Sequence, residues 1–258
     1  MKKIYHFLVK IGINPLVFFN FIIHFPSVIS DLIKFKKLLG KNSEFKFGSF
    51  YPITIDKRNQ SGKISGAYFH HDLLVAKRIY NEKPQKHIDI GSRIDGFVAH
   101  VAVFREIEIF DIRPIESKIQ NIIFRQADFI TLPEDLHNYC DSVSSLNAIE
   151  HFGLGRYGDP IDPLGHVKAI RNIHQVLKPN GRFYFSVPIG RQRIEFNAHR
   201  VFDISYLLIL LQDMFDLVSF SYVDDNGDLY ENVELENEKI KANYGCYFGF
   251  GIFELIKK

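Results

Sequence analysis

Hydrophobic and polar residues alternate in a regular way after residue 86. Apolar runs of strand length are separated by stretches in which apolar residues return at helical spacing. The pattern predicts strands at 87–90, 107–111, 122–128, 142–147, 182–187, 217–223 and 246–255. It predicts helices at 67–82, 96–104, 164–177 and 203–213, with at most one helical turn in 112–121. Such alternation indicates a parallel α/β sheet. The last two strands are joined by an acidic loop without a helix, so we expect them to form an antiparallel pair at one edge.

The first 66 residues follow a different pattern and are expected to form a separate segment of amphipathic helices and a loop, with the main domain at 67–258. Asn14 can cap a first helix that has Pro15 in its first turn. A second helix is expected from about Ser27 to Leu39, ending at Gly40. Its polar side is basic and carries Lys34, Lys36, Lys37 and Lys41.

Two interpretations of this basic helix remain open. Residues 15–41 could lie on an anionic membrane surface, or the helix could pack on the core or on a second copy of the chain, which we favour. Asn20, His24 and Pro26 interrupt the apolar run, which argues against a membrane span and a signal peptide.

Composition narrows the function classes. The 258 residues are 46% hydrophobic and 24% charged, as in soluble globular proteins. A net charge of +2 provides no global basic field for nucleic acid, so none is expected as a partner. Two cysteines cannot form a disulfide framework, which suits a reducing compartment, and we expect a cytoplasmic protein, with the inner face of the membrane as an alternative.

Acidic and amide side chains follow the first four strands of the predicted sheet. Ligands bind at the carboxyl ends of such strands. Asp111 lies 20 residues beyond Gly91, where a carboxylate can accept both hydroxyls of a ribose, which predicts a nucleoside-containing cofactor. Gly91 and Gly96 fit a dinucleotide motif, but Arg93 replaces its middle glycine, and Phe97 replaces the lysine of a P-loop.

S-adenosylmethionine (SAM) fits this loop better, because it contains ribose and adenine but no phosphate. Asp89 could bind its amino group, and Arg93 or a helix N-terminus its carboxylate. The predicted cofactor-binding residues are Asp89, Gly91, Ser92, Arg93, Asp111, Ile112, Asp128, Phe129 and Asn147.

The sequence resembles class I SAM-dependent methyltransferases over residues 65–256. The segments that carry the resemblance are HIDIGS, FDIRP, QADFITLP, DSVSSLNAIEHF, VLKPNGRFYFSVP and HRVFDISYLLILL. More closely, DIGSRIDGFVAHV and EHFGLGRYGDPIDPLG resemble an uncharacterised bacterial methyltransferase-like family that is often encoded in surface-polysaccharide gene clusters. The resemblance implies a Rossmann-like α/β fold with seven strands in the order 3-2-1-4-5-7-6, strand seven antiparallel and helices on both faces. The chain departs from the usual G-x-G-x-G, because Arg93 and Asp95 stand at two glycine positions, and its connection after Asp111 is shorter than a full helix.

A glycine-rich loop, Gly153–Pro160, follows the fourth strand and is expected to lie over the transferred methyl group. His151 is the candidate general base for an alcohol acceptor, with Glu150 as its orienting partner. The alternative is that this pair only fixes the loop or contacts the cofactor. The predicted substrate-binding residues are Arg156, Tyr157, His199, Arg200, His71 and Tyr68, with Arg156 suited to a phosphate or a sugar carboxylate. No metal site is predicted.

Three functions are therefore compared. The first is a SAM-dependent methyltransferase, acting on oxygen of a sugar or nucleotide-sugar intermediate of a bacterial surface glycan. The second is a catalytically degenerate methyltransferase-like binding partner, which the missing glycines favour. The third is a Rossmann enzyme that binds NAD or a nucleotide-sugar, which Arg93 and the antiparallel strand pair disfavour.

Overall fold

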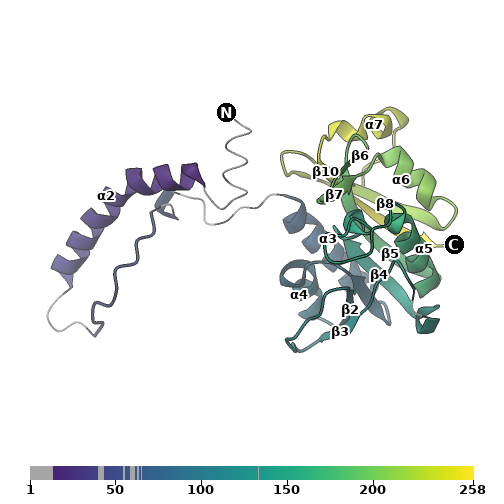
Figure 1. Ribbon diagram of the computed structural model, residues 1–258, viewed down its shortest axis with the longest axis horizontal. Coiled ribbons are helices and arrows are strands. Elements are labelled where there is room, and N and C mark those ends of the chain that lie inside the picture. Colours follow the sequence, from purple (N-terminus) through teal and green to yellow (C-terminus); the bar gives the residue numbers. More distant parts are fainter. Residues whose placement is uncertain are drawn as a thin grey trace. The chain divides into compact units, whose positions relative to one another are not determined.

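Eight strands form the central sheet of the computed structural model (Figure 1). Their order is β3-β2-β1-β4-β5-β10-β8-β9. Strands β1 to β5 pair in parallel, and β10 is antiparallel to both β5 and β8. The bounds are β1 His87–Ile90, β2 Ile107–Asp111, β3 Ile122–Gln126, β4 Cys140–Leu146, β5 Leu177–Ile189, β8 Phe215–Val223, β9 Leu229–Tyr230 and β10 Gly249–Lys257. The predicted order is confirmed, with the two-residue β9 added beside β8 as an eighth strand.

The structure describes residues 14–39, 44–54, 56–58, 62, 64, 66–132 and 134–258. The chain divides into two compact units, residues 1–63 and residues 64–258, and each is described by itself. Gly40 and Lys41, which were assigned to the end of the second N-terminal helix, lie outside the described residues.

Helices cover both faces of the sheet. One face packs against α3 (Ala67–Glu82) and α4 (Ala99–Ala102), through Leu74, Val75, Ile79 and Val101 among others. The other face packs against α5 (Gly165–Val176) and α6 (Ile204–Leu211). Strand β5 serves both cores, because Phe183 and Phe185 point to one face and Tyr184 to the other, as the two-residue period of a strand requires.

Two local predictions were wrong, and one element was missed. The helix expected at 96–104 is an irregular turn, Ile94–Val98, followed by the short α4, because Gly96 adopts φ −126° and ψ −106°, outside the helical region. The loop between the last two strands contains a helix after all, α7 (Asn237–Lys241). A small hairpin of β6 (Arg193–Glu195) and β7 (His199–Val201), which was not predicted, lies between β5 and α6.

In the N-terminal unit, one helix replaces the two that were expected. Helix α2 runs continuously over Pro15–Leu38, with Pro26 inside it. The predicted cap is confirmed, because the Asn14 side chain accepts hydrogen bonds from the amides of Leu16 and Val17, and Pro15 occupies the first turn. No residue of α2 is buried.

Candidate functional site

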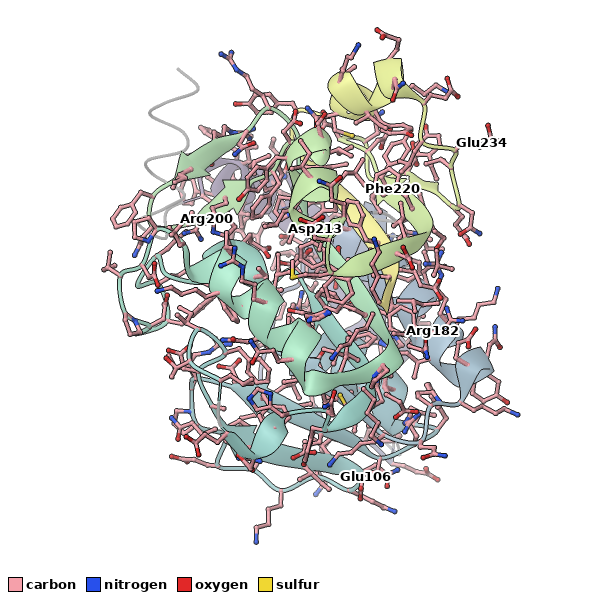
Figure 2. All side chains as sticks on the ribbon, turned by 90° about the vertical axis from the view of Figure 1, so that its right-hand side faces the viewer. Glu106, Arg182, Arg200, Asp213, Phe220 and Glu234 are labelled. Atoms are coloured by element: carbon pink, nitrogen blue, oxygen red, sulfur yellow. The ribbon has the colours of Figure 1, made fainter. Side chains whose placement is uncertain are left out.

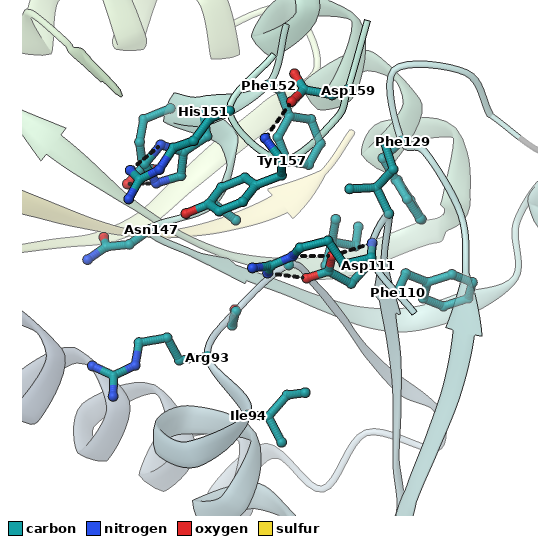
Figure 3. Close-up of a pocket in the computed structure, with 18 of the residues that line it drawn as sticks. Arg93, Ile94, Phe110, Asp111, Phe129, Asn147, His151, Phe152, Tyr157 and Asp159 are labelled. Atoms are coloured by element: carbon teal, nitrogen blue, oxygen red, sulfur yellow. Dashed lines mark hydrogen bonds and ion pairs between the residues drawn. The ribbon is translucent and has the colours of Figure 1, made fainter. Parts of the chain in front are cut away.

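A cavity of about 1000 Å³ opens at the carboxyl ends of β1, β2, β3 and β4 (Figure 3). Its walls come from the loop after β1, the segments after β2 and β3, and the glycine-rich loop after β4. Most of the predicted site residues line it: Tyr68, Gly91, Ser92, Arg93, Asp111, Ile112, Asp128, Phe129, Asn147, Glu150, His151, Arg156, Tyr157 and His199. Asp89, His71 and Arg200 do not.

The loop after β1 forms a tight turn, although Arg93 and Asp95 replace two glycines of the usual G-x-G-x-G pattern. Gly91 has φ +71°, and a Cβ there would lie 2.9 Å from the Cβ of Ala148. Arg93 and Asp95, at the substituted positions, pair with each other: Nε to Oδ1 is 3.1 Å and Nη2 to Oδ2 is 2.9 Å. The Arg93 guanidinium lies 4.8 Å from the ring centroid of Tyr68, and Figure 3 shows it directed away from Asp111. The space in front of the loop backbone therefore remains open.

Asp89 holds the loop from behind, contrary to the expectation of a direct cofactor contact. Its carboxylate accepts hydrogen bonds from the Ser92 amide at 3.0 Å, the Ser92 hydroxyl at 2.6 Å and the Ser144 hydroxyl at 2.6 Å. Burial raises the pKa of Asp89 to about 6, against the effect of these hydrogen bonds. The residue is buried in the sheet and fixes the conformation of the loop that faces the cavity.

Asp111 projects into the cavity from the end of β2, as predicted. Its Oδ1 accepts hydrogen bonds from the Arg113 amide at 2.8 Å and from Arg113 Nε at 3.0 Å, and its Oδ2 accepts one from Nη2 at 2.8 Å. A carboxylate offers about four acceptor positions, so one remains for a ribose hydroxyl with Arg113 in place. The Arg113 side chain is 53% exposed, so a ribose would have to compete with it for the other positions.

The wall beside Asp111 is apolar. Phe129 is buried and packs edge-to-face on Phe110, with the ring centroids 5.3 Å apart. Ile112 also lines this side. Asp128 is held by its own turn, because its Oδ1 accepts a hydrogen bond from the Ile130 amide at 2.8 Å. This side of the cavity therefore combines an apolar wall with the carboxylates of Asp111 and Asp128.

His151 and Glu150 lie together on one 3₁₀ turn, Ile149–His151, directly after β4. The Nδ1–H of His151 donates to the Ala198 carbonyl at 2.7 Å, so the lone pair is on Nε2. Glu150 Oε1 is 3.7 Å from Nε2, beyond hydrogen-bond distance. The orienting group is therefore the Ala198 carbonyl, in correction of the predicted role of Glu150.

Burial removes the charge from both side chains. It lowers the pKa of His151 to about 4 and raises that of Glu150 to about 8. At neutral pH, His151 is therefore an uncharged imidazole and Glu150 a protonated carboxyl group. Glu150 Oε2 is buried without a hydrogen-bond partner among the described residues.

Asp159 shapes the glycine-rich loop, a role that the sequence analysis missed. Its carboxylate accepts hydrogen bonds from the amides of Gly153 at 2.7 Å, Gly155 at 3.2 Å and Tyr157 at 3.2 Å. These contacts hold Tyr157 over the cavity, where its ring centroid lies 4.3 Å from the Arg113 guanidinium and 5.0 Å from that of Arg156. An aspartate within a glycine-rich turn is the signal that could have found it.

Arg200 and His71 are structural side chains, contrary to their predicted substrate contacts. Arg200, which is labelled in Figure 2, is buried. It donates to the carbonyls of Phe152 at 2.6 Å, Glu150 at 3.3 Å and Pro163 at 3.3 Å. His71 is also buried, with Nε2 3.4 Å from Asn147 Nδ2. Burial lowers the pKa of His71 to about 3, so it is neutral.

His199 does line the cavity, as predicted. Its ring lies 4.9 Å from that of Phe248, and its Nε2 is 3.4 Å from Glu195 Oε2. Phe248 and Phe250, from the C-terminal part of the chain, complete this side and were not predicted. Within the described part of the chain, no group of three or more His, Cys, Asp or Glu side chains could hold a metal ion.

Residues 103–246, more than half of the chain, match the family model described as "Caenorhabditis protein of unknown function, DUF268". The chain belongs to the DUF268 family. This description names Caenorhabditis and not the bacterial surface-polysaccharide family that the sequence resembles. No curated protein matches this DUF268 chain.

Solved structures show which fold this DUF268 protein has. A candidate sarcosine dimethylglycine methyltransferase from Galdieria sulphuraria is 13% identical, with a TM-score of 0.51 over 72% of this chain and 84% of that chain. A Burkholderia thailandensis 1,6-didemethyltoxoflavin-N1-methyltransferase, with bound 1,6-didemethyltoxoflavin and S-adenosylhomocysteine, is 14% identical, with a TM-score of 0.50 over 73% and 79%. The DUF268 chain therefore has the Rossmann-like fold of these methyltransferases.

Proposed function

We propose that this chain is a SAM-dependent methyltransferase. The observation that carries the proposal is the position of Asp111, which projects from the end of β2 into one cavity with the Gly91 loop. In an α/β sheet of this order, that edge is where a ligand binds. A carboxylate there recognises the two hydroxyls of a ribose.

The cavity fits the rest of the cofactor as well. Ligand sites of about 300–1,000 Å³ are usual, so this one has room for SAM and a second small molecule. Phe129 and Ile112 would contact the adenine, and the Gly91 loop and Arg93 would face the methionine carboxylate. Glu150, buried with an unpartnered Oε2, could accept a hydrogen bond from the amino group. Bound SAM would supply a methyl group activated by a positively charged sulfur.

His151 is the proposed general base, for a hydroxyl acceptor. Its Nε2 lone pair is available because Nδ1–H is committed to the Ala198 carbonyl. As the acceptor oxygen attacks the methyl carbon, Nε2 takes the hydroxyl proton, and the carbon–sulfur bond breaks with its electron pair staying on sulfur. The step requires a neutral imidazole, and burial keeps His151 neutral at physiological pH. The same lowered pKa makes His151 a weaker base than a histidine of ordinary pKa, so most of the driving force would come from the activated methyl group.

The acceptor is proposed to carry an anionic group, as a nucleotide-sugar does. Arg156 lines the cavity, and none of the ion pairs found among the described residues includes it. Its Nη1 donates to the neutral Ala198 carbonyl at 2.9 Å and lies 3.4 Å from Nδ1 of the uncharged His151, so no anionic group in the described part of the chain pairs with it. A guanidinium in this position suits a phosphate or a sugar carboxylate. The resemblance stated above supports a cytoplasmic reaction on a surface-glycan intermediate.

A second candidate function is a methyltransferase-like binding partner without catalysis. The observation that favours it is the bidentate pair of Arg113 with Asp111, which competes with a ribose for the same carboxylate. A function that needs no cofactor would also explain why two glycines of the loop could be replaced. In that case the chain would not bind SAM or its product.

Thermal unfolding with S-adenosylhomocysteine separates the two candidates. A ligand at about 100 times its Kd stabilises a protein by roughly 2.7 kcal/mol, which raises the Tm of a domain of this size by several degrees. We expect that rise with S-adenosylhomocysteine and none with NAD. Arg113→Ala is the matched variant. It frees the Asp111 carboxylate, so the rise in Tm with S-adenosylhomocysteine should be kept or become larger. A Tm that S-adenosylhomocysteine leaves unchanged in both proteins would favour the binding partner.

A further inference from the structure

The first turns of α2 are apolar on every side. Seven large hydrophobic side chains are exposed there, with exposed fractions of 38% to 65%: Leu16, Val17, Phe18, Phe19, Phe21, Ile22 and Ile23. Successive helical residues point about 100° apart, so these side chains surround the helix. A protein partner covers one face of a helix, whereas a helix that is apolar all round is enclosed in a core or in lipid.

The other end of α2 is basic. Lys34, Lys36 and Lys37 are exposed in its last turns. The 16 residues from Pro15 to Ser30 contain no Asp, Glu, Lys or Arg, and they extend over about 24 Å of helix, most of a hydrocarbon core of about 30 Å. By length and composition α2 is able to cross a membrane, with a mean hydropathy of 1.8 and none of its residues in that window buried. Asn20, His24 and Pro26, which were expected to interrupt the apolar run, all lie inside this continuous helix.

We propose that α2 is a membrane anchor, inserted into the bilayer from its Pro15 end and held at an anionic lipid surface by Lys34, Lys36 and Lys37. Lipid is the occupant that can cover all sides of the apolar turns, and anionic headgroups match the charge of the lysines. Five lysines lie at and after this end of α2 (Lys34, Lys36, Lys37, Lys41 and Lys46), against three before it (Lys2, Lys3 and Lys10), and the more basic side of an inserted helix stays on the cytoplasmic side. Because residues 64–258 follow these five lysines in the chain, the unit that holds the cavity lies on that same side.

Vesicle flotation of the full chain tests the anchor. The vesicles contain either phosphatidylcholine alone or phosphatidylcholine with phosphatidylglycerol. We expect the protein to float with the mixed vesicles and to remain with them after a carbonate wash, which removes proteins bound only at the surface. Replacing Phe18, Phe19 and Ile22 by Ser should reduce flotation at least 10-fold. The matched control, with Ser at the exposed Ile194, Phe196 and Ile209 of the other unit, should float as the wild type does.

The lysines are tested separately. Gln at Lys34, Lys36 and Lys37 should weaken partitioning into the mixed vesicles on the order of 100-fold and remove the preference over phosphatidylcholine alone. Three results would overturn the proposal. The first is that the wild-type protein stays in solution. The second is that the wild type does not float but forms a dimer, which the Phe18, Phe19 and Ile22 variant converts to a monomer. The third is that the intact mass of the membrane-recovered protein shows that α2 has been removed. The rise in Tm with S-adenosylhomocysteine is measured on the same variants. It tests the proposed function separately, because none of the three results above would change it.

Discussion

Replacing the buried Glu150 by glutamine should change how the stability of the protein depends on pH. Burial raises the pKa of Glu150 from 4.5 to about 8 in the folded protein. Between these values the folded chain holds one proton that the unfolded chain has released. The folded state therefore loses stability as the pH rises through this window, by about 1.4 kcal/mol for each pH unit.

The expected magnitude follows from these two pKa values. From about pH 5 to about pH 7.5 the loss attributable to Glu150 is on the order of 3 kcal/mol. Glutamine has nearly the same shape and does not titrate, so Glu150→Gln should not suffer this loss. Any cost of burying the extra amide N–H groups is independent of pH and shifts the whole curve equally. Residues such as His71 and His87, whose pKa values burial lowers, titrate in both proteins and cancel in the difference.

The assay is urea unfolding, followed by circular dichroism at a series of pH values, for the wild type and Glu150→Gln. The difference in free energy of unfolding should grow steadily in favour of the variant as the pH rises. Two curves that stay parallel across this range would refute the reasoning, since they would mean that Glu150 is ionised in the folded protein. The neutral state that we assign to the Glu150 and His151 turn would then be wrong.

Three further predictions concern binding and stability. Asp111→Ala should weaken S-adenosylhomocysteine binding 10- to 100-fold, because hydrogen bonds to a charged group contribute about 1.5–3 kcal/mol, and calorimetry measures it. Gly91→Ala should lower stability by roughly 1–3 kcal/mol and reduce the Tm rise with S-adenosylhomocysteine, because φ is +71° and the new Cβ would meet that of Ala148 at 2.9 Å. Arg200→Ala should cost about 2–4 kcal/mol in urea unfolding, since it leaves buried carbonyls without donors, whereas an effect on acceptor binding alone would show that Arg200 does contact substrate.

The sheet could be predicted because its signal is local. Each strand is a short apolar run that ends at a polar residue such as Asp111. The order of the strands came from the resemblance to class I SAM-dependent methyltransferases and not from the apolar pattern. The short hairpin of β6 and β7 and the helix α7 were missed because they bury few side chains and leave no periodic pattern. The continuation of α2 through Pro26 was missed because a proline removes one hydrogen bond but does not always end a helix.

The candidate site was predictable to the extent that it follows strand ends. Gly91, Asp111, Asp128 and Asn147 all line the cavity, as expected from their positions. Asp89 does not line the cavity. Its carboxylate is directed into the sheet, where it accepts a hydrogen bond from Ser144 on the neighbouring strand, and the sequence does not reveal this contact. Side-chain direction depends on contacts between distant segments, which periodicity does not report.

The same limit applies to Arg200 and to the orientation of His151. Arg200 stands beside His199 in the sequence, and the two-residue period of a strand sends one into the cavity and the other into the interior. The carbonyl that fixes His151 belongs to Ala198, in a hairpin that the sequence did not predict. Arg113 was not predicted as a site residue, because its pair with Asp111 depends on the side-chain direction, although the two residues are close in sequence.

The most direct test of the central claim is isothermal titration of the purified full chain with S-adenosylhomocysteine, with NAD as the control ligand. Our account predicts saturable binding of one S-adenosylhomocysteine per chain, lost or strongly weakened in Asp111→Ala, and no binding of NAD. No heat of binding from S-adenosylhomocysteine, in the wild type and in Arg113→Ala alike, would contradict it.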